Sequence, residues 1–264
     1  IRDPKIRFKE DPHRILRMVR FATFLGFSIE PQTFQSALQL SYLLNNVSVE
    51  RIKAELDKIL LLDKPSLSFH LMNDLNILQV ILPEIIPSIG CKQNHYHVYD
   101  VFDHILDVVN RTRKDKQLRW AALFHDIGKP LSVIFDGDGI RRFFNHENIG
   151  ADLSIEIMTR LKFSKEEIKT ISLLVREHMR SVISTPKAVR KTLFKLGDHF
   201  DLWLELKTAD IFAKRSNSVN SEKLRKEYDK FIIQVCIEQN REKEKHPLSS
   251  LSINGNDLIE LGFK

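Results

Sequence analysis

The stretch LRWAALFHDIGKP, residues 118–130, ends an apolar segment with an adjacent imidazole and carboxylate. Residues 118–124 are mostly apolar or small, which is typical of a buried helix, and His125 and Asp126 follow directly. A helix end needs only one polar side chain to bond its free backbone groups. Two side by side, both of metal-ligating type and followed by Ile-Gly-Lys-Pro, therefore indicate a metal site at the end of a core helix.

Further residues of metal-binding type occur where a helical fold can bring them to this pair. The six candidate ligands are His104, His125, Asp126, His146, His178 and Asp210. Imidazole and carboxylate together suit a divalent metal such as Mn, Fe, Ni or Mg, and the sequence leaves its identity open. Six ligands suffice for two ions, with Asp126 as the bridge. Since a single histidine in a helical protein is usually a surface or core residue, the prediction depends on the adjacent pair.

Such a site has an expected chemistry. A metal-bound water with a lowered pKa can attack a phosphorus centre, and a nearby ammonium group can steady the phosphoryl charge. Lys129 lies three residues after Asp126. Asp126 and Lys129 are therefore the candidate catalytic residues of a phosphohydrolase.

The remaining sequence predicts an all-α fold. Apolar residues recur every three or four positions, as in Ile168, Ile171 and Leu174, and prolines stand where helices would begin or break. One hairpin is expected in residues 131–144, around a Gly-Asp-Gly turn that contains the only Asp-x-Asp pair, interpreted as turn chemistry. The expected order is a helical region (1–92), a helical metal domain with the hairpin (93–215) and a C-terminal helical tail (216–264).

Composition excludes several classes of protein. The 264 residues are 42% hydrophobic and 29% charged, as in a globular protein, and no apolar run approaches the ~18 residues of a membrane helix. Two distant cysteines and the lack of a signal peptide favour a reducing cytoplasm. A net charge of +6 favours a polyanionic partner. Because the sequence starts at isoleucine, we expect it to be part of a longer protein.

A second constellation lies in residues 7–27, RFKEDPHRILRMVRFATFLGF. With Pro12 in the first turn of a helix, the polar residues near it can share one face. These are Glu10, Asp11, Arg14 and Arg17. An acidic cap with intrahelical ion pairs, worth ~0.2–0.5 kcal/mol per pair, explains the same pattern.

Both constellations resemble known families. His104, His125-Asp126 and Asp210 resemble the HD superfamily of metal-dependent phosphohydrolases over residues 93–215, and His146 and His178 resemble its two-metal members. The E-D-x-x-R of residues 10–14 resembles the nucleotide-selecting motif of class II CCA-adding tRNA nucleotidyltransferases and their bacterial poly(A) polymerase relatives. Residues 47–61, VSVERIKAELDKILL, and 251–264, LSINGNDLIELGFK, resemble later segments of that family.

The second resemblance implies a role for each residue of the motif. The Asp11 carboxylate accepts from the exocyclic amine of cytosine or adenine and the Arg14 guanidinium donates to a ring nitrogen, while Glu10 and Arg17 hold them. Uracil inverts this pattern, so CTP and ATP are the expected nucleotides and tRNA the expected partner. His13 departs from the family, which usually has a hydrophobic residue there, and we expect it to point away from the base. The family's Mg-binding catalytic head is expected before Ile1, so this piece alone should not add nucleotides.

Three functions remain open. The first is the C-terminal part of a tRNA nucleotidyltransferase, CCA-adding or A-adding, that selects CTP and ATP and holds tRNA, with an HD domain that hydrolyses phosphate esters. The second is a metal-dependent HD phosphohydrolase or phosphodiesterase as the main activity. The third is a non-catalytic RNA-binding module. Basic clusters in residues 1–20 and 213–231 agree with RNA binding, although a solvated helix face explains the latter equally well.

Overall fold

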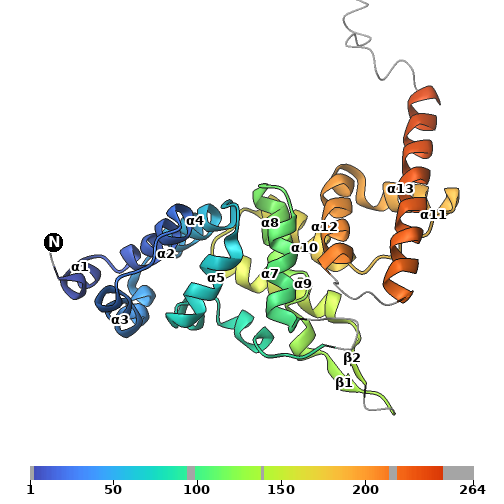
Figure 1. Cartoon of the computed structure of the whole chain (residues 1–264). Helices are drawn as coiled ribbons and strands as arrows, with labels where there is room; N and C mark the ends of the chain where they lie inside the picture. Colours follow the sequence, from blue (N-terminus) through green and yellow to red (C-terminus); the bar gives the residue numbers. More distant parts are fainter. Residues whose placement is uncertain (1–2, 94–98, 138–139, 214–218, 246–264) are drawn as a thin grey trace, which may run out of the picture. The chain divides into compact units, whose positions relative to one another are not determined.

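The computed structural model describes residues 3–93, 99–137, 140–213 and 219–245 (Figure 1). These residues form two compact units, a larger one up to Arg180 together with residues 201–213, and a smaller one of residues 181–200 and 219–245. The all-α prediction is confirmed, because the described residues contain thirteen α-helices, short 3-10 turns and one two-stranded hairpin. None of the described helices is long and apolar enough to cross a membrane. The three-part division at residues 92 and 215 stays a prediction.

The larger unit contains eleven of the α-helices and the hairpin. Its helices are α1 (Pro4–Glu10), α2 (His13–Leu25), α3 (Pro31–Leu40), α4 (Val49–Leu60), α5 (Pro65–Asp74), α6 (Leu78–Ile81), α7 (Val101–Arg111), α8 (Lys116–Phe124), α9 (His146–Arg160), α10 (Lys165–Glu177) and α12 (Phe200–Ala213). The strands are β1 (Val133–Phe135) and β2 (Arg141–Phe143), paired antiparallel inside the predicted segment 131–144. The Asp138 of the predicted turn lies outside the described residues.

The helices begin where the sequence supplies a side chain that accepts a free backbone N–H. Asp100 accepts from the N–H of Asp103 at 2.8 Å at the start of α7, and Asp115 accepts from that of Leu118 at 2.9 Å at the start of α8. Proline takes the first helical position of α3 and α5, where a missing N–H costs nothing.

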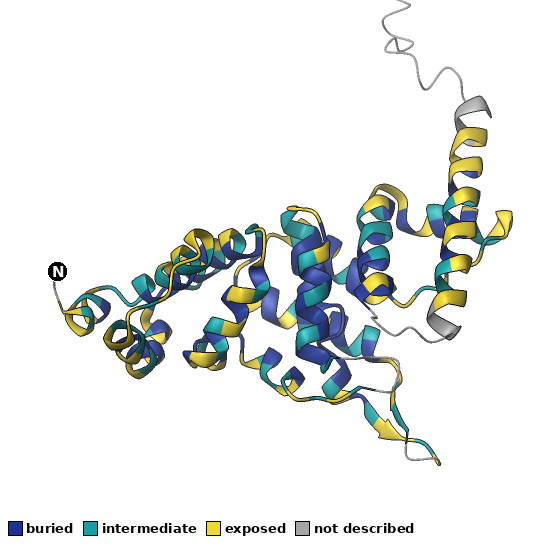
Figure 2. Ribbon diagram, viewed as in Figure 1, coloured by how far each residue is buried: buried dark blue, intermediate teal, exposed yellow. Residues whose placement is uncertain are grey.

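The core of the larger unit is centred on α8, the helix of the opening sequence. Every residue from Leu118 to Phe124 is buried, and Figure 2 shows α7 and α8 as largely buried. Trp120 is fully buried beside the rings of Phe124 and Phe163, and its indole N–H donates to Asp57 of α4 at 2.7 Å. The helix that ends in His125 is thus fixed on all sides.

The guanidinium of Arg119 connects α8 to the preceding helices. It is buried and donates to the backbone carbonyls of Leu60 and Leu62, at the C-terminal end of α4, and of Thr112 and Arg113, which follow α7. A buried charge is tolerated when its hydrogen bonds are satisfied. Arg119 therefore holds three chain segments together at the first turn of α8, the helix whose other end leads into His125.

The expectation that Glu10 and Asp11 share a helix face with Arg14 and Arg17 is wrong. Glu10 is the last residue of a separate helix, α1, and Asp11 has extended backbone (φ −149°) between α1 and α2. The physical reason is Pro12, because a proline disfavours helical backbone in the residue before it. The opposite side of α2 packs inward through Ile15 and Val19, which are fully buried.

The smaller unit contains α11 (Pro186–Leu196) and α13 (Val219–Lys245), which pack on each other. Buried Val189 and Leu196 of α11 and Phe231 of α13 supply its apolar contacts. Arg190 donates to Glu238 at 2.8 Å. The predicted helical tail is confirmed as far as Lys245, and the segment 251–264 lies outside the described residues.

We predict that Glu167 makes stability depend on acid pH. Burial raises the pKa of this carboxyl, but bonds from Lys116 (2.8 Å) and Ser164 outweigh it and lower the pKa to about 2. A lowered pKa stabilises the fold above the unfolded value of 4.5, and this stability is lost as pH falls toward 2. Glu167→Gln keeps the capping box and loses the charge, so it should cost about 1 kcal/mol at pH 7 and less than about half of that at pH 3.

The measurement is urea denaturation between pH 3 and pH 7. Glu166→Gln is the matched control, because it removes an exposed charge from the same helix turn. An equal, pH-independent loss in both variants would contradict the role of Glu167.

Candidate metal centre

The structure brings all six predicted ligand residues together in the larger unit, from five different helices or helix ends. His104 lies in α7, His125 and Asp126 follow α8, and His146 is the first residue of α9. His178 follows α10 and Asp210 lies in α12. All six side chains are buried. Their burial and convergence distinguish them from surface histidines and carboxylates.

The six side chains form two groups of three. One group is His104, His125 and Asp210, and the other is Asp126, His146 and His178. Within each group, one ligand atom from each residue lies within 4.8 Å of the others. Each group combines imidazole nitrogens with a carboxylate oxygen, a donor set that suits divalent transition metals.

The carboxylate of Asp126 faces both groups. Its Oδ2 lies 3.3 Å from Nε2 of His104 and 3.2 Å from Nε2 of His125. Its Oδ1 lies 3.4 Å from Nε2 of His146 and 3.5 Å from Nε2 of His178. One carboxylate thus presents one oxygen to each side, the arrangement expected of a ligand that bridges two ions.

Three of the histidines are oriented by their own backbone. Nδ1 of His125, His146 and His178 lies 2.6 to 2.7 Å from the carbonyl oxygen three residues earlier in the chain. A carbonyl only accepts, so each Nδ1 carries the proton and each Nε2 presents a lone pair toward Asp126. This tautomer is the one that binds a metal through Nε2.

Helix α12 supports the centre from outside the ligand set. The indole N–H of Trp203 donates to the Glu177 carbonyl and the buried ammonium of Lys207 donates to the His178 carbonyl, both at 2.8 Å. Both carbonyls lie at the end of α10, where backbone groups run out of partners within the helix, and that of Glu177 also accepts from the backbone N–H of Arg180 at 2.9 Å. Sequence reasoning missed both residues, because a lysine that bonds a backbone carbonyl has no motif.

Lys129, the second candidate catalytic residue, lies at the edge of the centre. Its Nζ is 2.6 Å from Oδ2 of Asp126 and donates to Oε1 of Gln93 at 2.7 Å. Gln93 was also missed, since it lies outside any motif. The ammonium group therefore faces the bridging carboxylate directly.

The electrostatics of the centre are those of a buried anion among cations. Burial raises the pKa of a carboxyl, but His125 and Lys129 outweigh it and hold the pKa of Asp126 well below its usual range. Burial opposes the charged form of His125, yet the adjacent Asp126 raises its pKa. Burial, with the neighbouring histidines, lowers the pKa of His178 to about 4, so that this ring is neutral and available as a ligand at pH 7.

These residues fit a divalent metal. Nε2 of His125 is buried without a hydrogen-bond partner, which is costly unless another group engages it. A metal ion between the Nε2 atoms and the carboxylate oxygens removes that cost.

A close backbone approach fixes the spacing across the centre. A Cβ on Gly128 would lie 2.3 Å from the carbonyl oxygen of His146 and 2.6 Å from the nitrogen of Gly150. Only glycine fits here, because both neighbours are backbone atoms of α9 that cannot rotate away. The Ile-Gly-Lys-Pro that follows the His-Asp pair thus brings α9, with His146, against the end of α8.

The four residues of the predicted nucleotide site lie near the start of the chain. Arg14 donates to Glu10 at 3.1 Å and to the Arg7 carbonyl at 3.0 Å. Asp11 accepts from Arg51 of α4 at 3.1 to 3.2 Å. Glu10 therefore holds Arg14 as expected, whereas the partner of Asp11 is Arg51, which sequence reasoning missed because it lies 40 residues away.

The remaining residues of this region have other neighbours. The guanidinium carbon of the exposed Arg17 lies 5.8 Å from the centre of the Phe21 ring. Nε2 of His13 lies 3.9 Å from the buried carboxylate of Glu55. The roles of Glu10, Asp11, Arg14 and Arg17 in nucleotide binding stay predictions.

Two family models match the chain. The model described as "Probable RNA and SrmB-binding site of polymerase A" matches residues 26–89, and the model described as "HD domain" matches residues 94–203, which include most of the metal centre. The chain belongs to the tRNA nucleotidyltransferase and poly(A) polymerase family. Five of the six candidate metal ligands lie in the segment that matches the HD domain, and α8 of that segment contacts α4 of the segment that matches the RNA-binding model.

Curated relatives agree with this family. The chain is 33% identical to an A-adding tRNA nucleotidyltransferase of Deinococcus radiodurans over 80% of the chain and 51% of that protein. It is 31% identical to a CC-adding tRNA nucleotidyltransferase of Thermus thermophilus over 78% of the chain and 50% of that protein. A multifunctional CCA protein of Actinobacillus pleuropneumoniae is 30% identical over 74% of the chain and 50% of that protein. The chain spans about half the length of the curated relatives it matches.

We predict that Gly128→Ala damages the HD centre. The added methyl group must push α9 away from the end of α8, at a cost of about 1–3 kcal/mol, and His146 moves with α9. The number of metal ions bound per chain, measured by mass spectrometry of the purified protein, should fall together with the melting temperature. Gly137→Ala is the control, because open space surrounds that position. Full metal content in Gly128→Ala would contradict the close approach.

Proposed function

We propose that the HD domain of this chain is a divalent-metal-dependent phosphohydrolase, carried by a tRNA nucleotidyltransferase. The observation that supports the hydrolase is the Asp126 carboxylate, buried between two groups of ligands with one oxygen toward each. A site that only stabilised the fold would not need two facing sets of ligands around one shared anion.

Each group would hold one ion, with Asp126 shared between them. Mn, Fe, Ni or Mg fit a donor set of imidazole and carboxylate. Bound there, divalent ions supply a water of lowered pKa as nucleophile and offset the charge that develops on a phosphate ester. Backbone carbonyls three residues earlier in the chain keep the rings of His125, His146 and His178 in the tautomer that leaves Nε2 available.

Two contacts of Lys129 support a role for it on the substrate. Its ammonium group is buried beside Oδ2 of Asp126, and Gln93 fixes it from the other side. A preorganised cation in a site that excludes water stabilises phosphoryl charge far more than an exposed one. We therefore assign Lys129 to the phosphoryl oxygens and Asp126 to the bridge.

Asp126→Asn should abolish hydrolysis. The amide keeps the shape of the side chain but lacks the negative charge that the two ligand groups share. The chain should therefore lose both metal ions, and its activity should fall at least about a hundredfold. The assay is hydrolysis of 2′,3′-cyclic nucleotides with added Mn²⁺, Ni²⁺ or Co²⁺, accompanied by metal analysis. Asp103→Asn, a half-exposed carboxylate on α7 outside the ligand set, should keep both metal and activity.

The alternative is a non-catalytic RNA-binding module. Tight tRNA binding by a chain that holds no metal and hydrolyses no phosphate ester would establish that alternative.

We also propose that Asp11 and Arg14 select CTP and ATP for nucleotide addition to tRNA. Arg14 is held by Glu10 and a backbone carbonyl, and Asp11 is only partly buried, so both retain polar atoms for a base edge. The similarity to A-adding and CC-adding enzymes supports this role. The transfer itself would require Mg bound by a catalytic head. We expect that head in the half of the relatives that this chain does not match. tRNA as partner and a cytoplasmic location follow from the same proposal.

Asp11→Ala and Arg14→Ala should each relax discrimination against UTP by at least about tenfold, because either loss removes one of the two complementary groups. The assay is nucleotide incorporation into tRNA by the complete gene product. Lys9→Ala, an exposed cation on α1, is the matched control. Unchanged nucleotide preference in both variants would contradict this assignment.

A further inference from the structure

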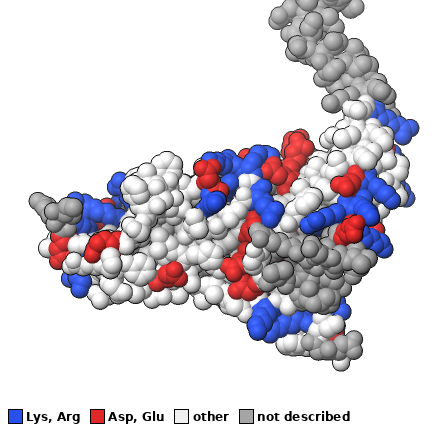
Figure 3. Space-filling view, in the orientation of Figure 1, with Lys and Arg blue, Asp and Glu red and all other residues white. Residues whose placement is uncertain are grey.

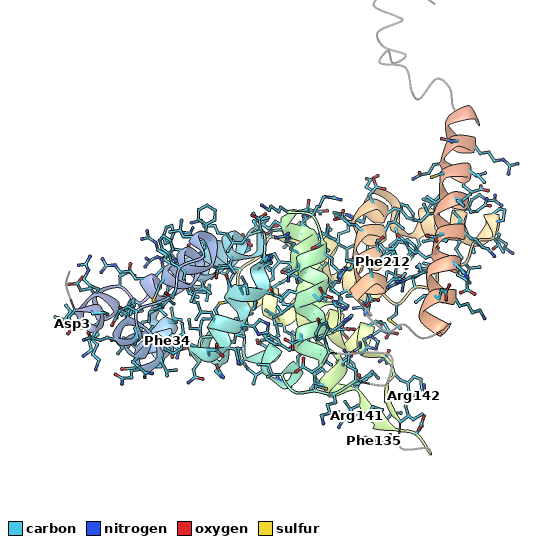
Figure 4. The ribbon with its side chains drawn as sticks, in the orientation of Figure 1. Asp3, Phe34, Phe135, Arg141, Arg142 and Phe212 are labelled. Atoms are coloured by element: carbon cyan, nitrogen blue, oxygen red, sulfur yellow. The ribbon has the colours of Figure 1, made fainter. Side chains whose placement is uncertain are left out.

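The β1–β2 hairpin exposes apolar side chains next to the HD centre. Phe135 is 61% exposed, although an isolated two-stranded ribbon gains little from an apolar residue in water. Figure 4 shows Phe135, Arg141 and Arg142 on this projecting hairpin. Exposed apolar groups on a ribbon flanked by cations are typical of a binding surface.

The register of the hairpin sorts its residues onto two faces. Val133 pairs with Phe143, Ile134 with Arg142, and Phe135 with Arg141. Because side chains alternate along a strand, Phe135, Arg141 and Phe143 share one face, together with Val133, while Ile134 and Arg142 occupy the other. We call the first set the aromatic face.

The aromatic face ends at the metal centre. Lys129 Nζ lies 5.7 Å from the centre of the Phe143 ring and 2.6 Å from Oδ2 of Asp126. The Phe143 carbonyl also accepts from Nδ1 of the ligand His146 at 2.6 Å. A molecule lying along this face therefore has one end beside Lys129.

The face is cationic as well as aromatic. The Arg141 guanidinium lies 5.6 Å from the centre of the Phe135 ring and donates to the Lys92 carbonyl at 2.8 Å. Figure 3 shows Lys and Arg gathered over this part of the molecule. On the other face, Arg142 is paired with Asp136 at 2.9 Å. Rings alternating with arginine favour a ligand that carries both flat bases and negative charge.

We propose that the aromatic face is a stacking platform for the end of a single-stranded RNA, which it guides into the HD centre. This inference rests on the proposed phosphohydrolase and specifies its substrate as a polynucleotide end. Phe135 and Phe143 lie two residues apart along the ladder, or ~7 Å, and offer separate rings to bases. Arg141 contacts a phosphate between them, and the terminal phosphate ester reaches Lys129. A duplex does not fit this role, because its bases are already stacked on each other.

The first test compares two substrates of the whole chain with Mn²⁺. One is 2′,3′-cyclic AMP, which reaches only the centre, and the other is a five-nucleotide RNA that ends in a 2′,3′-cyclic phosphate. Phe135→Ala should lower kcat/KM for the RNA about tenfold, and Arg141→Ala about fivefold, with less than a twofold change for the mononucleotide. Ile134→Ala and Arg142→Ala, on the other face, are matched controls that should change neither substrate by more than twofold.

Two results would overturn the platform. One is an equal effect on both substrates, since that indicates damage to the HD centre itself. The other is an equal loss of kcat/KM for the RNA in variants of both faces, or no loss in any of them. Either result means that the RNA does not bind through the aromatic face.

A binding measurement separates this inference from the hydrolase. Trp120 and Trp203 are fully buried, so Phe135→Trp introduces an indole whose emission reports on the hairpin. The five-nucleotide RNA should quench that emission strongly, with a quench that weakens in added salt, whereas Ile134→Trp should respond weakly. If neither substrate is hydrolysed but the quench occurs at position 135 alone, the platform stands and the hydrolase fails. If RNA does not quench the emission at position 135, the platform is refuted. That is also the result expected if the hairpin binds a protein instead of RNA.

Discussion

The larger unit depends on one buried negative charge. The Asp126 carboxylate is almost fully buried, and such a charge is costly unless cations and donors surround it. The ammonium of Lys129 lies 2.6 Å from it, and the Nε2 atoms of four imidazoles, from α7, the end of α8, α9 and the end of α10, face it as ligands for a metal ion. The helices of the HD domain must therefore converge on one point, and the same convergence produces the two facing ligand groups.

The surrounding structure preserves that convergence. Gly128 lets α9 approach the end of α8, and Lys207 and Trp203 tie α12 to the end of α10. Arg119 links α8 to carbonyls at the C-terminal end of α4, so the segment that matches the RNA-binding model and the HD domain share one core. We expect a substitution in either region to destabilise the other, because the buried guanidinium of Arg119 has no partners to replace its four carbonyls.

The sequence predicted the parts of the centre that have a chemical signature. Adjacent His125 and Asp126 at the end of an apolar helix are rare enough to identify the site, and the hairpin followed from its turn residues. Arg51, Gln93 and Lys207 were not predictable, since each acts through a partner far away in the chain that only folding brings near. The break at Pro12 was predictable in principle, but helical spacing was given more weight than the restriction that proline places on Asp11.

The most direct measurement is the anomalous diffraction of Mn²⁺ in crystals of this chain. The account predicts two peaks per molecule, about 3.5–4 Å apart, one within each ligand group and with the Asp126 carboxylate between them. A single peak, or peaks away from both groups, would contradict the claim that Asp126 bridges two metal ions.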